Sequence, residues 1–426
     1  MTLFELYLKC GRRVTTDSRA VSGGEIFFAL RGENFDGNGF ALAALDAGAA
    51  YAVVAEDALL PSDERLIKVP DTYLALRQLA VDYRNYLKIP VIGLTGTNGK
   101  TTTKELIREV LSCKFKVSAT AGNLNNDIGV PLTILSIPED ARVAVVEMGA
   151  SHPDDIAKLV QVAMPDYGLI TNVGKAHLLG FGSFEGVKAA KGELYKWLGK
   201  REGSVIFLNA DDKDLSALAA KEACHIWSYG IGYQSVELLP SSPDNPFLGL
   251  KLGDETINTH FVGAYNANNI LAAIAVGEYF GVPRKDAVKA VCDYVPANSR
   301  SQMVRTAKNT LIVDAYNANP SSMEAALDNF RNVESQSKWA LLGDMRELGS
   351  ESSKEHGKVV DRLVSDGLDA FLVGEEFTAA AQGTSFKCFA TSDELASFLA
   401  ANPILDSFVL VKGSRGTRME KVLDVL

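Results

Sequence analysis

The most informative stretch of the chain reads Ile92-Gly-Leu-Thr-Gly-Thr-Asn-Gly-Lys-Thr-Thr102. Its apolar beginning, residues 91–95, lies between a proline and a glycine, as is typical of a buried parallel strand. After Lys100 the pattern becomes helical through about Leu111, so a glycine-rich turn leads directly from a strand into a helix. Such a turn can point its backbone N–H groups and the helix N-terminus at a phosphate group.

The side chains of this turn favour a nucleoside triphosphate. Lys100 can reach the β- and γ-phosphates, and the Thr101 hydroxyl can hold a magnesium ion. The strict G-x-x-x-x-G-K-[ST] pattern is not met, because Leu94 stands where its first glycine belongs, and an ordinary strand–helix loop is the alternative. We predict that ATP binds to this phosphate loop, which comprises Gly96, Thr97, Asn98, Gly99, Lys100, Thr101 and Thr102.

Length and composition indicate an ordinary globular protein of several domains. The chain has 426 residues, and at roughly 150 residues per domain this suggests about three domains. Hydrophobic residues make up 47% and charged residues 23%, so each domain can bury a core. The net charge of −10 disfavours a nucleic-acid-binding surface, since phosphate backbones attract an excess of lysine and arginine.

The chain is expected to act in the cytoplasm, without membrane insertion. No apolar run approaches the length of a membrane span, and the first residues lack the order of charge and hydrophobicity of a signal peptide. The scattered cysteines contain no C-x-x-C pair, so we expect them to be reduced thiols. We also expect the protein to be a monomer. These cysteines are Cys10, Cys113, Cys224, Cys292 and Cys388.

Strand and helix patterns alternate along the chain, which predicts an α/β protein with parallel sheets. We divide it into a small N-terminal α/β domain (1–86), a central doubly wound domain (87–299) and a C-terminal Rossmann-like α/β domain (300–426). The predicted strands outside the segment 91–95 are 25–30, 50–55, 142–147, 167–172, 204–209, 225–229, 310–314, 338–342, 370–373 and 407–411.

Three polar residues follow predicted strands or lie on a predicted helix of the central domain. Glu147 ends an apolar run, where a carboxylate at the edge of a parallel sheet is a natural magnesium ligand. His177 follows the next strand, although a lone histidine is more often structural. Lys191 reads as an ordinary surface charge on a helix. Each position taken alone is a weak signal.

Together, several segments resemble the Mur ligases, a family that builds the peptide stem of bacterial cell-wall precursors. They are Gly96–Thr101, Gly122–Pro131, Glu147–Gly149, Asn172–His177, Asn209–Asp212, Asp314–Pro320, Leu342–Gly349 and Val411–Arg415. The Y-N-A-N-P and L-G-D-M-x-E-L-G forms are similar to those of the subgroup that adds D-alanyl-D-alanine to UDP-N-acetylmuramoyl-tripeptide. The resemblance therefore implies an ATP-dependent, amide-forming ligase that works through an acyl phosphate.

The resemblance also implies how the catalytic residues act. Lys100, Glu147, His177 and Lys191 would be catalytic, with Thr101 and Glu147 holding one Mg²⁺ and His177 helping to hold a second. Lys191 matches a lysine that many family members carbamylate with CO₂, which would turn its ammonium into an anion able to support the second ion. Closure of the C-terminal domain onto the central one would bring in the amino substrate and exclude water.

Substrate-binding residues follow from the resemblance as well. For the UDP substrate they are Ser18, Arg19, Gly32, Asp36, Gly37, Asn123 and Asn125, with Asn126 on the same loop. For the nucleotide they are Asn266, Asn269, Arg300 and Asp314, although Tyr265 stands where histidine is usual. For the dipeptide and the C-terminal domain they are Tyr316, Asn317, Asn319, Lys412 and Ser414, and Asp344 and Glu347 lie in comparable loops.

Some of these residues have purely structural alternatives. Asn266 is placed to cap a helix, and Ser321 with Glu324 reads as a capping box for another. Three other functions remain open: another Mur-type or folate-polyglutamate-forming ligase, a nucleotide-gated switch without ligase chemistry, and a dehydrogenase. The dehydrogenase is disfavoured, because no G-x-G-x-x-G follows a strand.

Overall fold

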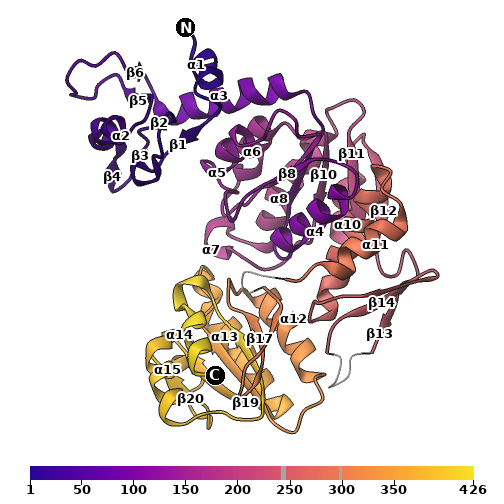
Figure 1. Cartoon of the computed structure of the whole chain (residues 1–426). Helices are drawn as coiled ribbons and strands as arrows, with labels where there is room; N and C mark the ends of the chain where they lie inside the picture. The colour runs from indigo at the N-terminus through magenta and orange to yellow at the C-terminus, as the bar shows by residue number, and fades with distance from the viewer. Residues whose placement is uncertain (241–245, 297–299) are drawn as a thin grey trace.

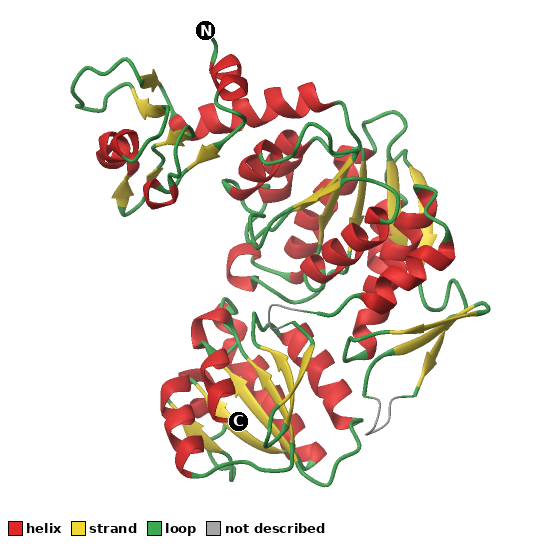
Figure 2. Ribbon diagram, in the orientation of Figure 1, coloured by secondary structure: helices red, strands yellow, loops and turns green. Residues whose placement is uncertain are grey.

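The computed structural model describes residues 1–240, 246–296 and 300–426, which form three α/β domains in chain order (Figure 1). Their main sheets are separate from one another. Figure 2 shows the strands of the central and C-terminal sheets flanked by helices. The boundaries after residues 86 and 299 remain predictions, and the second lies in the segment 297–299, outside the described residues.

The N-terminal domain is built on a parallel sheet in the order β1-β2-β5-β6. Helix α2 (Ala41–Asp46) packs its alanines against Phe27 and Ala52 of this sheet. A short hairpin of β3 and β4 projects from it and was not predicted. The strands are β1 (Val14–Thr15), β2 (Ile26–Phe28), β3 (Arg31–Gly32), β4 (Phe35–Asp36), β5 (Tyr51–Ala55) and β6 (Leu66–Val69), and they follow α1 (Leu3–Lys9).

Helix α3 (Thr72–Leu87) joins the N-terminal domain to the central one (Figure 1). Asp71 caps its start by accepting a hydrogen bond from Leu74 N–H, and the helix ends at Lys88 in a left-handed conformation. Its apolar face joins a buried cluster that contains residues of both domains. The helix therefore fixes the N-terminal domain through burial as well as through the chain connection.

The central sheet is entirely parallel, in the order β12-β11-β10-β7-β9-β8. Helices α5, α6 and α8 pack on one face, with α3 lying against α5 and α6, while α4, α10 and α11 pack on the other face, which is the predicted doubly wound arrangement. The strands are β7 (Val91–Thr95), β8 (Val117–Ala119), β9 (Val143–Glu147), β10 (Tyr167–Ile170), β11 (Val205–Asn209) and β12 (His225–Tyr229). The helices are α4 (Lys100–Ser112), α5 (Gly129–Leu135), α6 (Asp155–Ala163), α7 (Leu178–Phe181), α8 (Phe184–Leu198), α9 (Lys213–Ala219), α10 (Ala267–Tyr279) and α11 (Arg284–Asp293).

The C-terminal sheet has the order β16-β17-β21-β18-β19-β20, with only β16 antiparallel to its neighbour among the described strands. No helix among the described residues is long and apolar enough to cross a bilayer. The strands are β16 (Gln302–Arg305), β17 (Thr310–Asp314), β18 (Lys338–Gly343), β19 (Asp369–Val373), β20 (Lys387–Phe389) and β21 (Phe408–Lys412). The helices are α12 (Pro320–Arg331), α13 (Ser352–Asp366), α14 (Glu375–Ala380) and α15 (Ser392–Ala401).

Two local predictions need correction. An antiparallel sheet beside the central domain was not predicted; its strands are β13 (Glu237–Leu239), β14 (Gly249–Leu252) and β15 (Glu255–Asn258). The predicted cap of α12 was also wrong: the cap is Asn319, two residues before the predicted Ser321, so the helix begins at Pro320 and its capping box joins Asn319 to Ser322. Proline fits the first helical position, because it has no N–H that would need a partner there.

We expect Tyr83→Phe to lower the free energy of unfolding by about 1–3 kcal/mol, because it leaves a buried carbonyl without its donor. Tyr83 on α3 is fully buried, and its hydroxyl donates to Ile137 O at 2.6 Å. Thermal unfolding would measure the change. Tyr86→Phe is the matched control, since Tyr86 is exposed and its hydroxyl bonds, within the described part of the chain, only to the exposed Glu139. Equal melting temperatures for the two variants would contradict the expectation.

Candidate active site between the central and C-terminal domains

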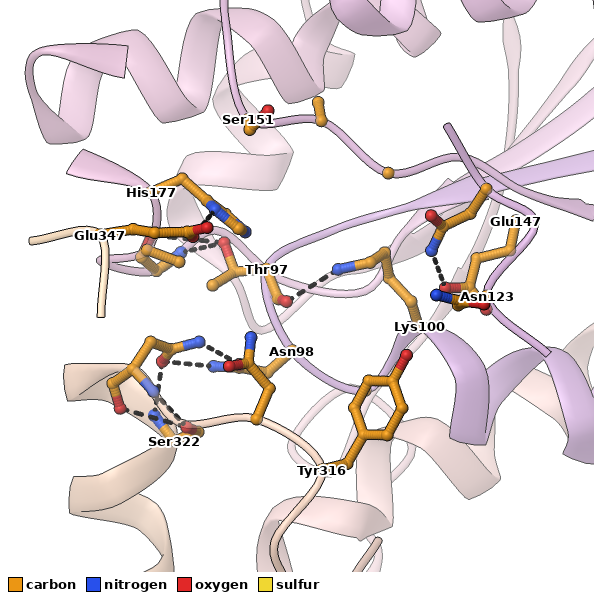
Figure 3. Close-up of a pocket in the computed structure, with 18 of the residues that line it drawn as sticks. Thr97, Asn98, Lys100, Asn123, Glu147, Ser151, His177, Tyr316, Ser322 and Glu347 are labelled. Atoms are coloured by element: carbon orange, nitrogen blue, oxygen red, sulfur yellow. Dashed lines mark hydrogen bonds and ion pairs between the residues drawn. The ribbon is translucent and has the colours of Figure 1, made fainter. Parts of the chain in front are cut away.

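A cavity of about 1230 Å³ lies where the carboxyl ends of the central and C-terminal strands face each other (Figure 3). Loops after β7, β9 and β10 line it from the central domain, and loops after β17, β18 and β21 line it from the C-terminal domain. Ligands of open α/β sheets bind at this edge. Most residues predicted for catalysis and for the nucleotide line this one cavity.

Close packing fixes the phosphate loop. Gly96 has φ +145°, and a Cβ there would lie 2.0 Å from Thr171 Oγ1. Gly99 has φ +78°, and a Cβ there would lie 2.6 Å from Asn269 Oδ1. Neither position admits a side chain, because the backbone passes too close to these two groups.

Asn172 uses two main-chain donors of the phosphate loop. Thr97 N–H donates to Asn172 O, and Asn98 N–H donates to Asn172 Oδ1, both at 3.0 Å. Helix α4 starts at Lys100, and the N–H groups at a helix start have no partner within the helix. The donors that can face an anion are therefore those of residues 99–102, while Thr97 and Asn98 would use other atoms.

Lys100 lies over the loop, half-buried. Its ammonium donates to Gly96 O at 2.8 Å and to Thr97 O at 2.9 Å. An ammonium has three donors, so a third stays available for a phosphate oxygen. Burial lowers the pKa of Lys100, nearby Glu147 opposes this shift, and the Arg300 guanidinium lowers the pKa further.

Glu147 and Thr101 form a buried pair of oxygen ligands. Glu147 is 1% exposed; its Oε2 accepts from the Thr101 hydroxyl at 2.9 Å and its Oε1 accepts from Asn125 Nδ2 at 2.8 Å. Thr120 Oγ1 accepts the Glu147 N–H at 2.9 Å and so fixes the end of β9. A hydroxyl and a carboxylate at this spacing suit Mg²⁺, which also takes phosphate oxygens and water.

His177 faces the C-terminal domain. Its Nδ1 contacts the Glu347 carboxylate, although not in the alignment of a hydrogen bond (Figure 3). Burial lowers the pKa of His177; Glu347 opposes the shift, and Lys100 and Lys191 add to it. The ring therefore favours its neutral form, which is the form that binds metals.

Lys191 on α8 is buried, at 2% exposure, and its ammonium has only Ala150 O at 3.3 Å as a hydrogen-bond acceptor among the described residues. No carboxylate of the described chain forms an ion pair with it. Burial, reinforced by Lys100, lowers the pKa of Lys191 to about 7. Near neutral pH a large fraction of this amine is therefore unprotonated and nucleophilic.

The two asparagines predicted to contact adenine are buried beneath the phosphate loop. Asn269 Oδ1 accepts from the Thr103 hydroxyl at 3.1 Å, and Asn269 Nδ2 donates to Asn266 Oδ1 at 3.0 Å. Asn266 Nδ2 donates in turn to Val262 O at 3.0 Å, so its side chain does not cap α10. Tyr265 reaches the cavity and bonds to Ser301 Oγ at 2.8 Å.

Arginine and lysine side chains line the C-terminal wall. Lys412 is fully buried and pairs with Asp314. Arg300 stacks on Tyr316, with its guanidinium carbon 3.7 Å from the ring centre. Arg415 donates to the Tyr316 hydroxyl at 3.3 Å. Asn317 lines the same wall, and Ser414 accepts the Arg346 N–H at 2.9 Å and donates to Asp344 O.

The residues predicted for the UDP group are divided between two places. Asn123 and Asn125 line the cavity. Ser18, Arg19, Gly32, Asp36 and Gly37 lie in the N-terminal domain outside it. There Asp36 caps a short helical turn, and a Cβ on Gly37 would lie 2.4 Å from Leu30 O, so this glycine is needed for the turn.

Family models match nearly the whole chain. The model described as "Mur ligase family, catalytic domain" matches residues 12–84, "Mur ligase middle domain" matches 94–277, and "Mur ligase, glutamate ligase domain" matches 299–415. A UDP-N-acetylmuramoyl-tripeptide--D-alanyl-D-alanine ligase from Bacillus subtilis is 35% identical over 96% of this chain and 92% of its own length. The chain belongs to the Mur ligase family.

Solved structures of similar proteins superpose on this Mur ligase over nearly its whole length. MurF from Acinetobacter baumannii is 33% identical, covers 97% of this chain with 92% of its own, and superposes with a TM-score of 0.86. MurF from Thermotoga maritima, solved in complex with ADP, is 27% identical, covers 100% of this chain with 98% of its own, and also gives 0.86. The comparisons confirm the family resemblance and the three-domain α/β fold.

Several cavity residues of this Mur ligase were missed or given no role from the sequence. Asn172 lies inside a quoted motif, but its two bonds to the phosphate loop could not be read from spacing. Tyr73 and Arg77 come from α3, which reads as an ordinary amphipathic helix. Other such residues include Asp155, Lys158, Ser321, Arg346 and Arg415.

We expect Lys191→Met to raise the melting temperature of this Mur ligase in CO₂-free buffer, most strongly below pH 7. There the lysine is charged in the folded and unfolded states, and the folded state bears the full cost of burying the charge. Between pH 7 and the ordinary lysine pKa of 10.5, the folded lysine loses its proton and the cost fades.

Thermal unfolding at intervals from pH 6 to pH 10 would measure this gain. Lys196→Met is the matched control, because Lys196 lies exposed on the same helix and its replacement removes no buried charge. A gain that stays constant across the pH range would contradict the assignment of a buried, unpaired amine to Lys191.

Proposed function

We propose that this Mur ligase uses ATP to join D-alanyl-D-alanine to UDP-N-acetylmuramoyl-tripeptide in peptidoglycan precursor synthesis. One observation carries the proposal: the free N–H groups of residues 99–102, Lys100 and the Thr101–Glu147 pair meet in a cavity completed by the C-terminal domain. The names of its relatives and the ADP complex of the Thermotoga maritima protein support it.

The reaction must bring a carboxylate up to a triphosphate. The terminal carboxylate of the tripeptide attacks the γ-phosphorus and ADP leaves, which gives an acyl phosphate. The unprotonated amine of the dipeptide then attacks the acyl carbon, and phosphate leaves as the amide forms. Positive charge between the anions lowers the barrier to the first step, and Lys100, Arg300 and the helix N-terminus supply it.

Two magnesium ions fit the residues present. Thr101 and Glu147 would hold the first through oxygen ligands, and His177 with a modified Lys191 would hold the second. The described residues contain no cluster of three acidic, histidine or cysteine ligands, so such ions would take their other ligands from phosphate and water. When bound, the ions supply neutralising charge near the transferred phosphoryl group.

Lys191 is suited to carbamylation. Its neutral Nζ would form a bond to the carbon of CO₂ and release one proton, so a carbamate anion replaces the ammonium. The lowered pKa supplies the neutral amine, and the absence of a carboxylate partner among the described residues leaves the group free to react. The anion would also offset the positive charges of Lys100 and of the metal.

The remaining residues divide into three groups. Asn266 and Asn269 would support the adenine side of the phosphate loop, with Arg300 and Asp314 toward the phosphates and ribose. The UDP group would lie against the N-terminal domain, at Ser18, Arg19, Gly32, Asp36 and Gly37, with the peptide passing Asn123 and Asn125. The dipeptide would lie on the C-terminal wall, near Tyr316, Asn317, Lys412 and Ser414.

Arg346 and Arg415 would bind the free carboxylate of the dipeptide. The dipeptide is a zwitterion, so a site that holds its amine near the acyl phosphate needs a cation for its other end. Lys412 is already neutralised by Asp314, whereas neither arginine has an ion pair with the described residues. Both line the cavity on neighbouring loops, which Ser414 ties together.

The physiological setting follows from the same chemistry. We propose a cytoplasmic monomer that binds no nucleic acid and does not insert into a membrane. The five cysteines are all free thiols, which fits a reducing compartment. A nucleotide-gated switch would hydrolyse or bind ATP without needing both substrates, and a folate-polyglutamate-forming enzyme would not use the UDP precursor.

We expect phosphate release from ATP to require both UDP-N-acetylmuramoyl-tripeptide and D-alanyl-D-alanine, with a product heavier by one dipeptide in mass spectrometry. Lys100→Ala should reduce the rate by at least about a hundredfold, because it removes the ammonium that stabilises the phosphoryl oxygens. Lys116→Ala, an exposed lysine paired with Asp140, is the control. Substrate-independent hydrolysis, or an active Lys100→Ala variant, would overturn the proposal.

We expect Arg415→Ala to raise KM for D-alanyl-D-alanine by roughly tenfold to a hundredfold, with KM for ATP unchanged, because one charged hydrogen bond is lost. D-alanyl-D-alaninamide lacks the carboxylate, so it should bind the wild-type enzyme weakly. Its affinity for Arg415→Ala should be no lower than its affinity for the wild type. Arg418→Ala tests a nearby exposed arginine outside the cavity. An Arg415→Ala variant that discriminates against the amide as strongly as the wild type would contradict this role.

A further inference from the structure

A pair of side-chain amides joins the phosphate loop to the C-terminal domain. Asn319 Nδ2 donates to Asn98 Oδ1 at 2.8 Å, and Asn98 Nδ2 lies 3.5 Å from Asn319 Oδ1 as a longer return contact. Asn98 is the third residue of the phosphate loop, and Asn319 precedes α12 (Figure 3 shows Asn98 beside the start of this helix, at Ser322). The two residues are 221 positions apart in the chain.

Hydrogen bonds within its own domain fix each of the two paired residues, Asn98 and Asn319. Asn98 is fixed by its backbone, since its N–H donates to Asn172 Oδ1, and its carbonyl accepts from Thr171 Oγ1 at 2.6 Å and from Asn172 Nδ2 at 2.9 Å. Asn319 is fixed by the capping box, in which its Oδ1 accepts from Ser322 N–H at 2.9 Å and its N–H donates to Ser322 Oγ at 3.1 Å. Little conformational entropy remains to be lost when the amides pair.

Neighbouring contacts join the same two domains through the loop after β10. Lys175 N–H donates to Ser321 Oγ at 3.0 Å, beside the amide pair, and the Lys175 ammonium pairs with Glu355 of α13 at 3.2 Å. Asn319 is 8% exposed, so its amide is largely withdrawn from water. The pair is thus part of a packed contact between domains, where an unpaired amide would be costly.

We propose that Asn319 is a positioning residue that binds the phosphate loop and not the dipeptide. Its amide holds the C-terminal domain against Asn98, so that nucleotide binding to the loop and docking of the domain strengthen each other. The coupling is reciprocal: whatever docking adds to nucleotide affinity, the nucleotide adds to docking. The inference rests on the proposed function, because it assigns the loop to ATP.

The test separates this pairing from the capping role of Asn319. Asn319→Ser keeps a good helix cap but is too short to reach Asn98. We expect it to weaken binding of a non-hydrolysable ATP analogue to the full-length protein about fivefold, the effect of one neutral hydrogen bond. KM for ATP should rise by the same factor, while kcat at saturating ATP changes little.

Ser322→Ala is the matched control. It removes one bond of the capping box but keeps the Ser322 N–H bond to Asn319 Oδ1 and the amide pair, so it should lower the melting temperature and change the affinity for the analogue far less than Asn319→Ser does. Asn98→Ala removes the pair from the other side and keeps the α12 cap intact. The double variant Asn98→Ala/Asn319→Ser should bind the analogue no more weakly than the weaker single variant, because both remove one interaction.

Each outcome decides a separate question. Wild-type affinity in Asn319→Ser or in Asn98→Ala, in a protein that still ligates, overturns the pairing role and leaves the proposed function intact. Independent, additive losses in the double variant also overturn it. A wild-type protein that binds the analogue but forms no amide product refutes the proposed function, while the binding measurements still report on the amide pair.

Discussion

The arrangement depends on one electrostatic constraint, which is that several basic groups are held close together in a partly buried region. Burial is the largest cause of the lowered pKa values of Lys100, Lys191 and His177, and neighbouring cations lower all three further. Glu147 opposes the shift at Lys100, and Glu347 opposes the shift at His177. Such crowding is unfavourable in a medium of low polarity. An anionic substrate relieves the repulsion, so the site is complementary to a triphosphate beside a carboxylate, and the strain is built into the protein before either arrives.

Two sheets that face each other at their carboxyl ends enclose the cavity beside these basic groups. One sheet alone would place strand-end residues along a single edge, open to water on the other side. Here Glu147 and the phosphate loop come from one edge, while Asp314, Glu347 and Lys412 come from the other. The cavity is thus assembled by domain docking, and its electrostatics depend on residues that are far apart in the chain.

Much of this was predictable from local sequence, because a strand followed by glycines and then a helix specifies its own geometry. The phosphate loop, Glu147 at the end of β9 and the alternating α/β pattern follow from such signals. Contacts between distant loops do not follow from local sequence. Asn172 accepts hydrogen bonds from two N–H groups of the phosphate loop, and Glu347 contacts His177, which is 170 residues away in the chain. The cap of α12 could have been predicted correctly from the sequence. Proline is common at the first helical position, so Pro320 indicates that Asn319 is the cap.

The backbone at the domain contact shows that docking shapes the site. His177 has φ +50° and Glu347 has φ +65°, and a left-handed conformation costs a residue other than glycine roughly 1–2 kcal/mol. The two strained residues contact each other, and the main chain beside them is joined by the Leu179 N–H bond to Glu347 O at 3.2 Å. Within the central domain, the His177 carbonyl accepts N–H bonds from Gly180 and Phe181, and the His177 ring packs edge-on against the Phe181 ring. The contact with Glu347 is added only when both domains are present, so the docked C-terminal domain further constrains the His177 ring.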